Sequence, residues 1–151
     1  MNPISFKQAK GADLDEVLEM MREYYAFDDL QFDVEGARPA LKSLIENKSF
    51  GRVWTIGCGT EHAGYLVLTF GYSLEFHGRF GLIDELYLRS PFRNRGIGSK
   101  ALAFAQHHCE SSGIPVLRLE VERVNLRARA AYRNFGFETH DRFLMTKWLS
   151  K

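Results

Sequence analysis

Residues 93–99, Arg-Asn-Arg-Gly-Ile-Gly-Ser, combine charged and flexible residues between an expected strand and an expected helix. The first amides of a helix have no partner within it and carry a partial positive charge, so they bind anions. Gly96 and Gly98 let the backbone approach a ligand closely, because no Cβ atoms stand in the way. Arg93 and Arg95 add full positive charges suited to phosphate oxygens. The segment therefore predicts a cradle for a diphosphate.

Two other phosphate-binding patterns fit this segment poorly. A Walker loop needs Gly-Lys followed by Ser or Thr after four spacer residues, and the sequence lacks it. A dinucleotide fingerprint needs a third glycine, but Ala101 stands at that place. The alternative to a diphosphate site is an ordinary strand-to-helix turn whose arginines are simply solvated.

Two motifs, in this order, resemble the GNAT superfamily of N-acetyltransferases. The pattern Arg93-x-x-Gly96-x-Gly98 is similar to the acetyl-CoA signature of that superfamily, and LIDELYLRSPFR before it is similar as well. The second motif is NLRARAAYRNFGF, which supplies Asn125, Ala128, Tyr132, Gly136 and Phe137. The resemblance spans nearly the whole chain. It implies a mixed, mostly antiparallel sheet, acetyl-CoA as cofactor and acetyl transfer to an amine.

Direct acetyl transfer requires a neutral amine, a polarised thioester carbonyl, aligned reactants and an acid for the departing thiolate. Asp84 and Glu85 are the candidates to take the proton of the amine. Neighbouring strand residues face opposite sides, so Asp84 joins Leu82, whereas Glu85 joins Ile83 and Tyr87.

Burying a carboxylate among leucines is costly, which favours Glu85 as the base or amine-binding group. Asp84 is then expected to bind substrate. A bulge in this strand would upset the alternation. The alternative is that both acids form structural ion pairs with nearby arginines.

The resemblance also implies which residues bind the coenzyme. Backbone groups of Leu86, Tyr87 and Leu88 would pair with the pantetheine arm as if it were an extra strand. One of these N–H groups would polarise the acetyl carbonyl. The loop residues expected to contact the coenzyme are Arg93, Asn94, Arg95, Gly96, Ile97, Gly98 and Ser99.

Tyr132 is the candidate acid. Asn125, Ala128 and Tyr132 lie at i, i+3 and i+7, so they share one helical face. In the superfamily, a tyrosine here stands near the coenzyme sulfur, and an asparagine near the helix start contacts the pantetheine. Both Asn125 and Tyr132 are thus expected to bind coenzyme, and Tyr132 to protonate sulfur. The alternative is a half-buried aromatic residue whose hydroxyl bonds to the backbone.

Periodicity predicts the elements that position these residues. The order is βααβββαβαβ, which indicates an α/β fold with a mixed sheet and helices on both faces, in a single domain over 1–151. The second helix contains Pro39, and is expected to start near residue 38 or to kink there. The expected strands cover 4–9, 52–57, 63–70, 80–88, 116–121 and 143–148, and the later helices cover 96–112 and 125–134.

In the superfamily, acceptor choice is set by the first two helices and by the loop between the third and fourth strands. Here these segments mix aromatic residues with acids, which suits a cationic amine. We expect Tyr25, Asp28, Tyr72 and Glu75 to bind the acceptor. A polyamine, an aminoglycoside-type amine, a protein N-terminus and a lysine side chain all stay open.

Composition excludes several classes of protein. Hydrophobic residues make up 45% and charged residues 26%, which argues against disorder. A net charge of +1 gives no reason to expect nucleic acid or an anionic membrane as partner. Cys58 and Cys109 fit reduced packing residues, and the five histidines show no metal-ligand spacing. Without a signal-peptide pattern or a membrane-length apolar run, the protein is expected to be cytoplasmic.

Two rival functions and the oligomeric state stay open. A non-catalytic acyl-CoA sensor would need residues 93–98 but neither Glu85 nor Tyr132. A nucleotide-binding regulator without acyl chemistry is the other rival. Late apolar residues would mediate a homodimer or, alternatively, complete the core of the monomer. These residues are Phe135, Phe137, Phe143 and Trp148.

Overall fold

A computed structural model describes residues 2–150. The chain forms two compact units, residues 1–120 and 121–151. The first unit contains a five-stranded sheet, and the predicted α/β fold is confirmed. Its elements are β1 (Ile4–Gln8), η1 (Gly11–Asp13), α1 (Leu14–Phe27), α2 (Val34–Glu46), β2 (Gly51–Cys58), β3 (Glu61–Ser73), β4 (Gly78–Leu88), η2 (Ser90–Phe92), α3 (Ile97–Ser111) and β5 (Leu117–Leu119). The second unit contains α4 (Leu126–Asn134).

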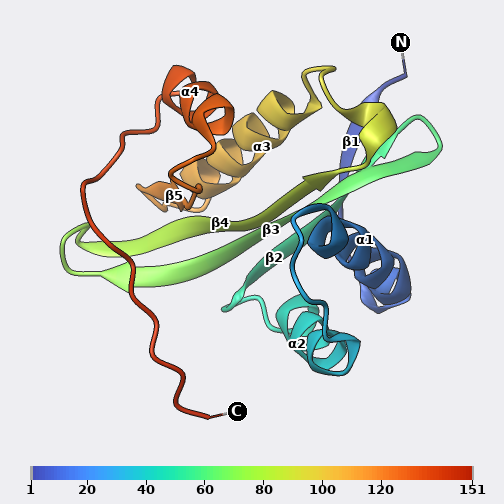
Figure 1. Cartoon of the computed structure of the whole chain (residues 1–151), viewed down its shortest axis with the longest axis horizontal. Helices are drawn as coiled ribbons and strands as arrows, with labels where there is room; N and C mark the ends of the chain where they lie inside the picture. Colours follow the sequence, from blue (N-terminus) through green and yellow to red (C-terminus); the bar gives the residue numbers. More distant parts are fainter. Residues whose placement is uncertain (1, 151) are drawn as a thin grey trace. The chain divides into compact units, whose positions relative to one another are not determined.

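The sheet has the order β1-β2-β3-β4-β5 (Figure 1). The first four strands are antiparallel, and β5 runs parallel to β4. Parallel pairing is short, because it joins only residues 81–83 to residues 117–119. The sheet is therefore mixed and mostly antiparallel.

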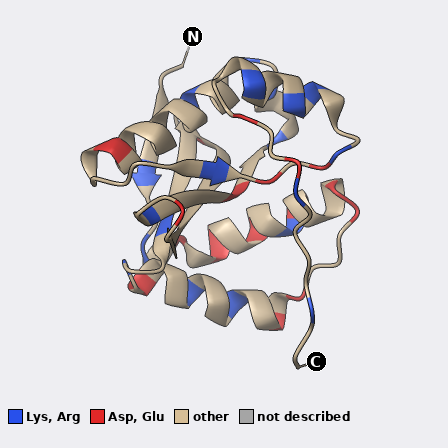
Figure 2. Ribbon diagram, turned by 90° about the vertical axis from the view of Figure 1, so that its left-hand side faces the viewer, with Lys and Arg blue, Asp and Glu red and all other residues tan. Residues whose placement is uncertain are grey.

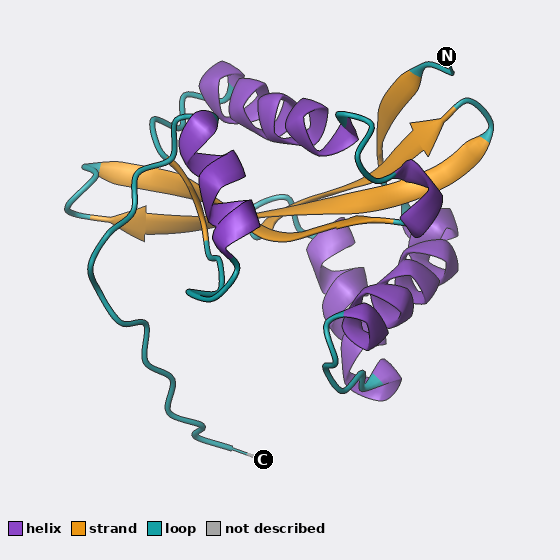
Figure 3. Ribbon diagram, turned by 45° about the horizontal axis from the view of Figure 1, so that its top comes forward, coloured by secondary structure: helices purple, strands orange, loops and turns teal. Residues whose placement is uncertain are grey.

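Helices cover both faces of the sheet in the first unit, as Figure 3 shows. Helices α1 and α2 pack on one face, where the buried core includes Met20, Tyr65 and Val67. Helix α3 covers the other face, where the rings of Trp54 and Phe104 meet edge to face at 5.0 Å. An apolar stripe on each helix explains these positions, since it must be removed from water.

A β-bulge interrupts the pairing of β3 with β4. Val67 lies opposite Glu85 and Leu68 lies opposite Ile83, so Asp84 is an extra residue on β4. Leu82 and Glu85 consequently lie on the same face of the sheet, the face that α1 and α2 cover. The bulge is the feature that positions the acidic pair.

The far ends of β3 and β4 form a two-stranded arm, residues 70–81. β2 pairs with β3 only as far as Thr69, whereas β3 and β4 stay paired up to Ser73 and Gly78. The arm extends past the rest of the sheet in Figure 1. Tyr72 on this arm is 71% exposed.

Two expectations about elements are wrong. Residues 143–148, all described, form no strand. A strand needs a partner or a core to stabilise it, whereas Phe143, Met145 and Trp148 are 80%, 88% and 85% exposed. Helix α2 begins at Val34 and contains Pro39 in its interior, so the expected start near residue 38 is wrong. The alternative, a kink at this proline, stays a prediction.

Acidic and basic residues are both spread over the chain (Figure 2). Within residues 2–150, no helix is both long enough and apolar enough to cross a membrane.

Candidate functional site

Glu85 lies directly after the bulge on β4 and is held by two tyrosines. The hydroxyl of Tyr25, near the end of α1, donates a hydrogen bond of 2.7 Å to Glu85 Oε2. The hydroxyl of Tyr65, on β3, donates one of 2.7 Å to Glu85 Oε1. Tyr65 is fully buried. Each carboxylate oxygen therefore has one fixed donor, and the carboxylate plane is oriented by two separate elements.

The surroundings of Glu85 change its acidity. Burial raises the pKa of the Glu85 carboxyl, the hydrogen bonds from Tyr25 and Tyr65 lower it, and the charge of Asp84 raises it again, with a net upward direction. Burial and the neighbouring Glu85 also raise the pKa values of both tyrosines. The two hydroxyls thus stay protonated donors, and Glu85 is a stronger base than an ordinary glutamate.

Asp84 is the more accessible of the two acids. Both Asp84 and Glu85 lie opposite Val67, because the bulge sets two residues against one. Asp84 lines a cavity of about 90 Å³ together with Leu82, Ile83 and Glu120. Desolvation raises the pKa of Asp84, and its charge raises the pKa of Tyr25.

The expected alternation of side chains along β4 is therefore wrong at one point. Glu85 shares a face with Tyr87 but not with Ile83, because the extra residue at 84 shifts the count by one. Strict alternation would separate Asp84 and Glu85 onto opposite faces. The bulge instead brings both carboxylates close to the tyrosine of α1.

The outer edge of β4 is open beyond the bulge. Of the strands in residues 2–150, only β5 pairs with that edge, and its pairing stops at Ile83. The Arg89 amide donates to the Ala63 carbonyl. Backbone hydrogen bonds to a neighbouring antiparallel strand come from every second residue, so Tyr87 also bonds to β3. The backbone groups of Leu86 and Leu88 therefore point outward, away from β3. An extended ligand arm can pair with such an edge.

The loop before α3 leaves backbone amides without acceptors. Gly96 caps the helix with a left-handed φ of 78°, and no side chain caps it. The Lys100 amide is the first to bond, at 3.2 Å to the Gly96 carbonyl. The amides of residues 97–99 find no acceptor in the part of the chain that the structure describes. A Cβ atom at Gly96 or Gly98 would meet nothing within 4 Å, so this turn has the space and the donors for a diphosphate.

The arginines of this loop are held by their own surroundings. Arg93 Nε donates to the Leu88 carbonyl at 2.8 Å, and its guanidinium lies 4.0 Å from the ring centre of Phe27. Arg95 donates to the Pro91 carbonyl at 3.3 Å. Arg93 therefore fixes the loop against both α1 and the end of β4.

The residues expected to bind an acceptor are not all gathered at Glu85. Tyr25 contacts it directly. Asp28 follows the last turn of α1, where its amide bonds to the Tyr24 carbonyl. Tyr72 and Glu75 lie on the arm of residues 70–81, and the Glu75 amide bonds to the Ser73 hydroxyl.

The second unit contains the two remaining predicted residues. Asn125 caps α4, and its side chain accepts a hydrogen bond of 3.1 Å from the Ala128 amide. Tyr132 lies two turns further along α4, where its ring meets that of Phe137 at 6.0 Å. Burial raises the pKa of Tyr132, so its phenol is protonated at neutral pH.

Two features of this site were missed from the sequence. Tyr65 was assigned only to a strand, although a tyrosine within an aliphatic run signals a buried hydroxyl that needs a partner. The second feature is a polar cluster between α1 and β4. Arg89 binds Glu23 through both carboxylate oxygens and lies 3.3 Å from Glu16, while the Tyr87 hydroxyl donates to Glu23 at 3.3 Å. This cluster fixes α1, and with it Tyr25, against β4.

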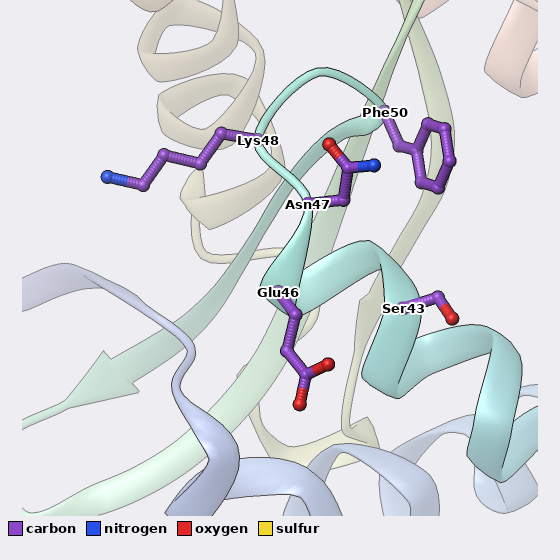
Figure 4. Close-up of a pocket in the computed structure, with 5 residues that line it drawn as sticks. All are labelled: Ser43, Glu46, Asn47, Lys48 and Phe50. Carbon is purple, nitrogen blue, oxygen red and sulfur yellow. The ribbon is translucent and has the colours of Figure 1, made fainter.

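A larger cavity than the one beside Asp84 lies elsewhere. It has a volume of about 540 Å³ and lies where α2 ends and β2 begins (Figure 4). It is open, and none of the predicted site residues lines it. The residues that line it are Ser43, Glu46, Asn47, Lys48 and Phe50. Among the described residues, no three His, Cys, Asp or Glu side chains are placed to hold a metal ion.

Comparison with known proteins places these features in a family. The family model of the acetyltransferase (GNAT) family matches residues 14–137. An uncharacterised N-acetyltransferase, YhfO of Bacillus subtilis, is 26% identical over 141 residues, which cover 93% of this chain and 94% of YhfO. The thialysine N-epsilon-acetyltransferase of Bos taurus is 26% identical over 146 residues, which cover 88% of this chain and 83% of that protein.

Solved structures have the same fold. An integron cassette protein from the mobile metagenome of Cole Harbour Salt Marsh has a TM-score of 0.85 and 30% identity, with 97% of this chain and 91% of that one covered. The aminoglycoside N-acetyltransferase AAC(6')-Iy, solved with CoA, has a TM-score of 0.83 at 10% identity, with coverage of 99% and 97%. Because the family model covers most of the sequence, the chain belongs to the GNAT family of acetyltransferases.

Proposed function

We propose that this protein transfers the acetyl group of acetyl-CoA directly to a primary amine, with Glu85 as the base. The observation that carries this proposal is the desolvated Glu85 carboxylate, which Tyr25 and Tyr65 hold beside the open edge of β4. A base with a raised pKa is suited to take a proton near neutral pH.

The coenzyme site follows from the fit of the loop. The amides of residues 97–99 and the charges of Arg93 and Arg95 would hold the diphosphate, and the outward backbone groups of Leu86 and Leu88 would hold the pantetheine arm. Acetyl-CoA supplies an acetyl group already activated as a thioester. The solved relative with CoA supports this choice of cofactor.

The two acids of the bulge have different roles in this proposal. Asp84, the more accessible one, attracts the ammonium form of the acceptor by its charge. Glu85 then removes a proton from the nitrogen, because only the neutral amine has a lone pair for attack. Tyr25 and Tyr65 keep the Glu85 carboxylate in place during this transfer.

The acceptor is proposed to be a small molecule with a primary amine, or a peptide. The relatives named for their substrates act on thialysine and on aminoglycosides, which supports an amine acceptor. Tyr25, Asp28, Tyr72 and Glu75 are kept as proposed acceptor-binding residues. Asn125 is kept as a proposed coenzyme contact.

We also propose that both units form one transferase domain, since the matched family model runs across residue 120. A homodimer through the exposed side chains of Phe143 and Trp148 is a further part of this proposal. A cytoplasmic location stays an expectation from the sequence.

Tyr65→Phe should shift the pH dependence of the rate. The hydrogen bond from Tyr65 lowers the pKa of Glu85, so its loss raises that pKa further. A rate that requires ionised Glu85 falls below this pKa, and the rising limb of kcat/KM therefore moves to higher pH. We expect a several-fold lower rate at neutral pH that recovers in alkaline buffer. Coenzyme A affinity, measured by calorimetry, should not change, and an unshifted profile would remove Tyr65 from this role.

Tyr132→Phe should lower turnover far more than it weakens coenzyme binding. The phenol is protonated and chemically able to give its proton to the departing thiolate, whereas phenylalanine is not. A loss of about 10²-fold in kcat is typical for a missing acid. Steady-state kinetics and calorimetry with coenzyme A measure the two effects separately. Unchanged turnover would exclude Tyr132 from the chemistry.

A thiol-release assay tests the proposed function as a whole. Purified protein is mixed with acetyl-CoA and a panel of polyamines, aminoglycosides, amino acids and peptides. Acceptor-dependent release of coenzyme A thiol supports the proposal. Tight binding of acetyl-CoA without release for any acceptor would instead favour a non-catalytic sensor, and tight binding of ATP without coenzyme A binding would favour a nucleotide-binding regulator.

A further inference from the structure

Arg118 lies on the same face of the sheet as Glu85. It is the middle residue of β5 and pairs in register with Leu82 of β4. The neighbouring pair, Gly81 and Leu117, faces α3, since a Cβ atom on Gly81 would meet Cys109 of that helix. Arg118 therefore faces the opposite side, and the bulge returns Glu85 to that side as well.

Aromatic rings hold Arg118 in place. Its guanidinium lies 5.1 Å from the ring centre of Phe76 and 5.5 Å from that of Phe80. Both phenylalanines belong to the arm of residues 70–81, and their rings meet edge to face at 5.9 Å. Contacts with ring faces leave the N–H groups of a guanidinium, which lie in its plane, available for other partners.

Within residues 2–150, Arg118 forms no ion pair and donates no hydrogen bond. Acids are present near this strand, because Glu120 directly follows β5 and lines a cavity together with Asp84. Arg89, by contrast, is paired with two glutamates. A half-buried arginine without an acid partner on this face is therefore a free anion-binding group.

The spacing of Arg118 from Glu85 suits one molecule with two ends. Leu82 and Glu85 lie opposite Thr69 and Val67, two residues apart on β3, which is roughly 7 Å along the strand. The step to the neighbouring strand adds about 5 Å. The Cα atoms of Arg118 and Glu85 are thus roughly 9 Å apart on one face of the sheet, so an elongated molecule with two charged ends can reach both side chains.

We infer that Arg118 binds the carboxylate of the acceptor, so that the acceptor is an amino acid with a side-chain amine. This inference rests on the proposed acetyl transfer at Glu85. The amine end reaches Glu85, and the acid end forms a paired hydrogen bond with the guanidinium over Phe76 and Phe80. Polyamines and aminoglycosides lack an acid group, so they leave Arg118 without a partner and are poorer acceptors.

Lysine and cadaverine form the test pair, because they differ only in the carboxylate. In the wild type, kcat/KM for lysine should exceed that for cadaverine. Arg118→Gln should lower the lysine value by about 10- to 100-fold, the range for a lost hydrogen bond to a charged group. The cadaverine value should stay within about twofold, since that acceptor has no acid for Arg118 to hold.

Two further variants control the result. Arg79→Gln removes an arginine that also lies over a ring of the arm, Phe70 at 4.5 Å, and it should change neither acceptor. Arg118→Lys keeps the charge but loses the paired geometry, so its lysine value should lie between wild type and Arg118→Gln. This variant also carries the test if Arg118→Gln fails to fold.

Equal effects of Arg118→Gln on lysine and cadaverine, or no effect on lysine, would overturn the inference. Calorimetry distinguishes a failure of this inference from a failure of the proposed acetyl transfer. If the wild type releases no thiol with either acceptor but binds lysine, and Arg118→Gln abolishes that binding, the acetyl transfer is refuted and the carboxylate site stands. Equal lysine binding by wild type and variant, or none by the wild type, refutes the site.

Discussion

Glu85→Gln should lower turnover by about 10²- to 10⁴-fold, the range typical for loss of a general base. The amide has nearly the shape of the carboxylate and still accepts a hydrogen bond from one of the two tyrosines, but it cannot take a proton from the amine. Thiol release at saturating acetyl-CoA and acceptor measures the loss.

Asp84→Asn is the matched control, because it changes the neighbouring acid by the same substitution. It should raise KM for a cationic acceptor more than it lowers kcat, since in the proposed mechanism Asp84 attracts the amine but does not deprotonate it. Coenzyme A affinity should be unchanged in both variants. A Glu85→Gln enzyme that keeps half of its turnover would contradict the assignment of the base.

The same substitution should stabilise the fold at neutral pH. The net direction of the Glu85 pKa in the folded protein is upward, so folding favours the protonated carboxyl. A group of this kind stabilises the folded state below its unfolded pKa and loses that contribution as pH rises through the folded pKa. Glutamine is neutral throughout, so Glu85→Gln should melt a few degrees higher at pH 7, with the difference disappearing in acid.

Gly98→Asp should weaken coenzyme A binding by roughly 100-fold or more, because a carboxylate would face the diphosphate across the free amides. The fold should tolerate it. A Cβ atom at Gly98 would meet nothing within 4 Å. The negative charge of an aspartate in the first turn of α3 also interacts favourably with the positive end of the helix dipole. Calorimetry with coenzyme A measures the affinity, and thermal unfolding measures the stability.

Gly98→Ala separates charge from bulk, since it adds a Cβ atom without a charge. It should cost much less affinity than the aspartate. If Gly98→Asp binds coenzyme A as tightly as the wild type, the diphosphate does not lie at the start of α3. A melting temperature well below wild type would instead show that the loop needs glycine for its own conformation.

Much of the fold was predictable because its signals are local. Alternation, helical spacing and the turn residues placed β1 to β5 and α1, α3 and α4 in the right order. The closing strand over 143–148 was not predictable in this way. Its apolar residues have the composition of a strand, but a strand also requires a partner, and periodicity carries no information about one.

The geometry at Glu85 depended on a feature that periodicity cannot show. A bulge depends on how two strands pair, which one strand's sequence does not show. The sequence therefore indicated that a bulge would disturb the alternation of side chains, but not that residue 84 would form one. Tyr65 and Arg118 were overlooked for a related reason. Each acquires its partners, Glu85 in one case and two aromatic rings in the other, from residues far away in sequence or on another strand.

The bulge has one consequence for how this protein tolerates change. In a regular strand, only every second side chain points to a given side of the sheet. At this bulge, the consecutive residues Asp84 and Glu85 both lie opposite Val67. Loss of the codon for Asp84 would leave Ile83 opposite Leu68 and Glu85 opposite Val67, with every later pair intact. A one-residue deletion, ordinarily ruinous inside a central strand, should therefore leave the sheet assembled and remove only the group that we propose to attract the substrate.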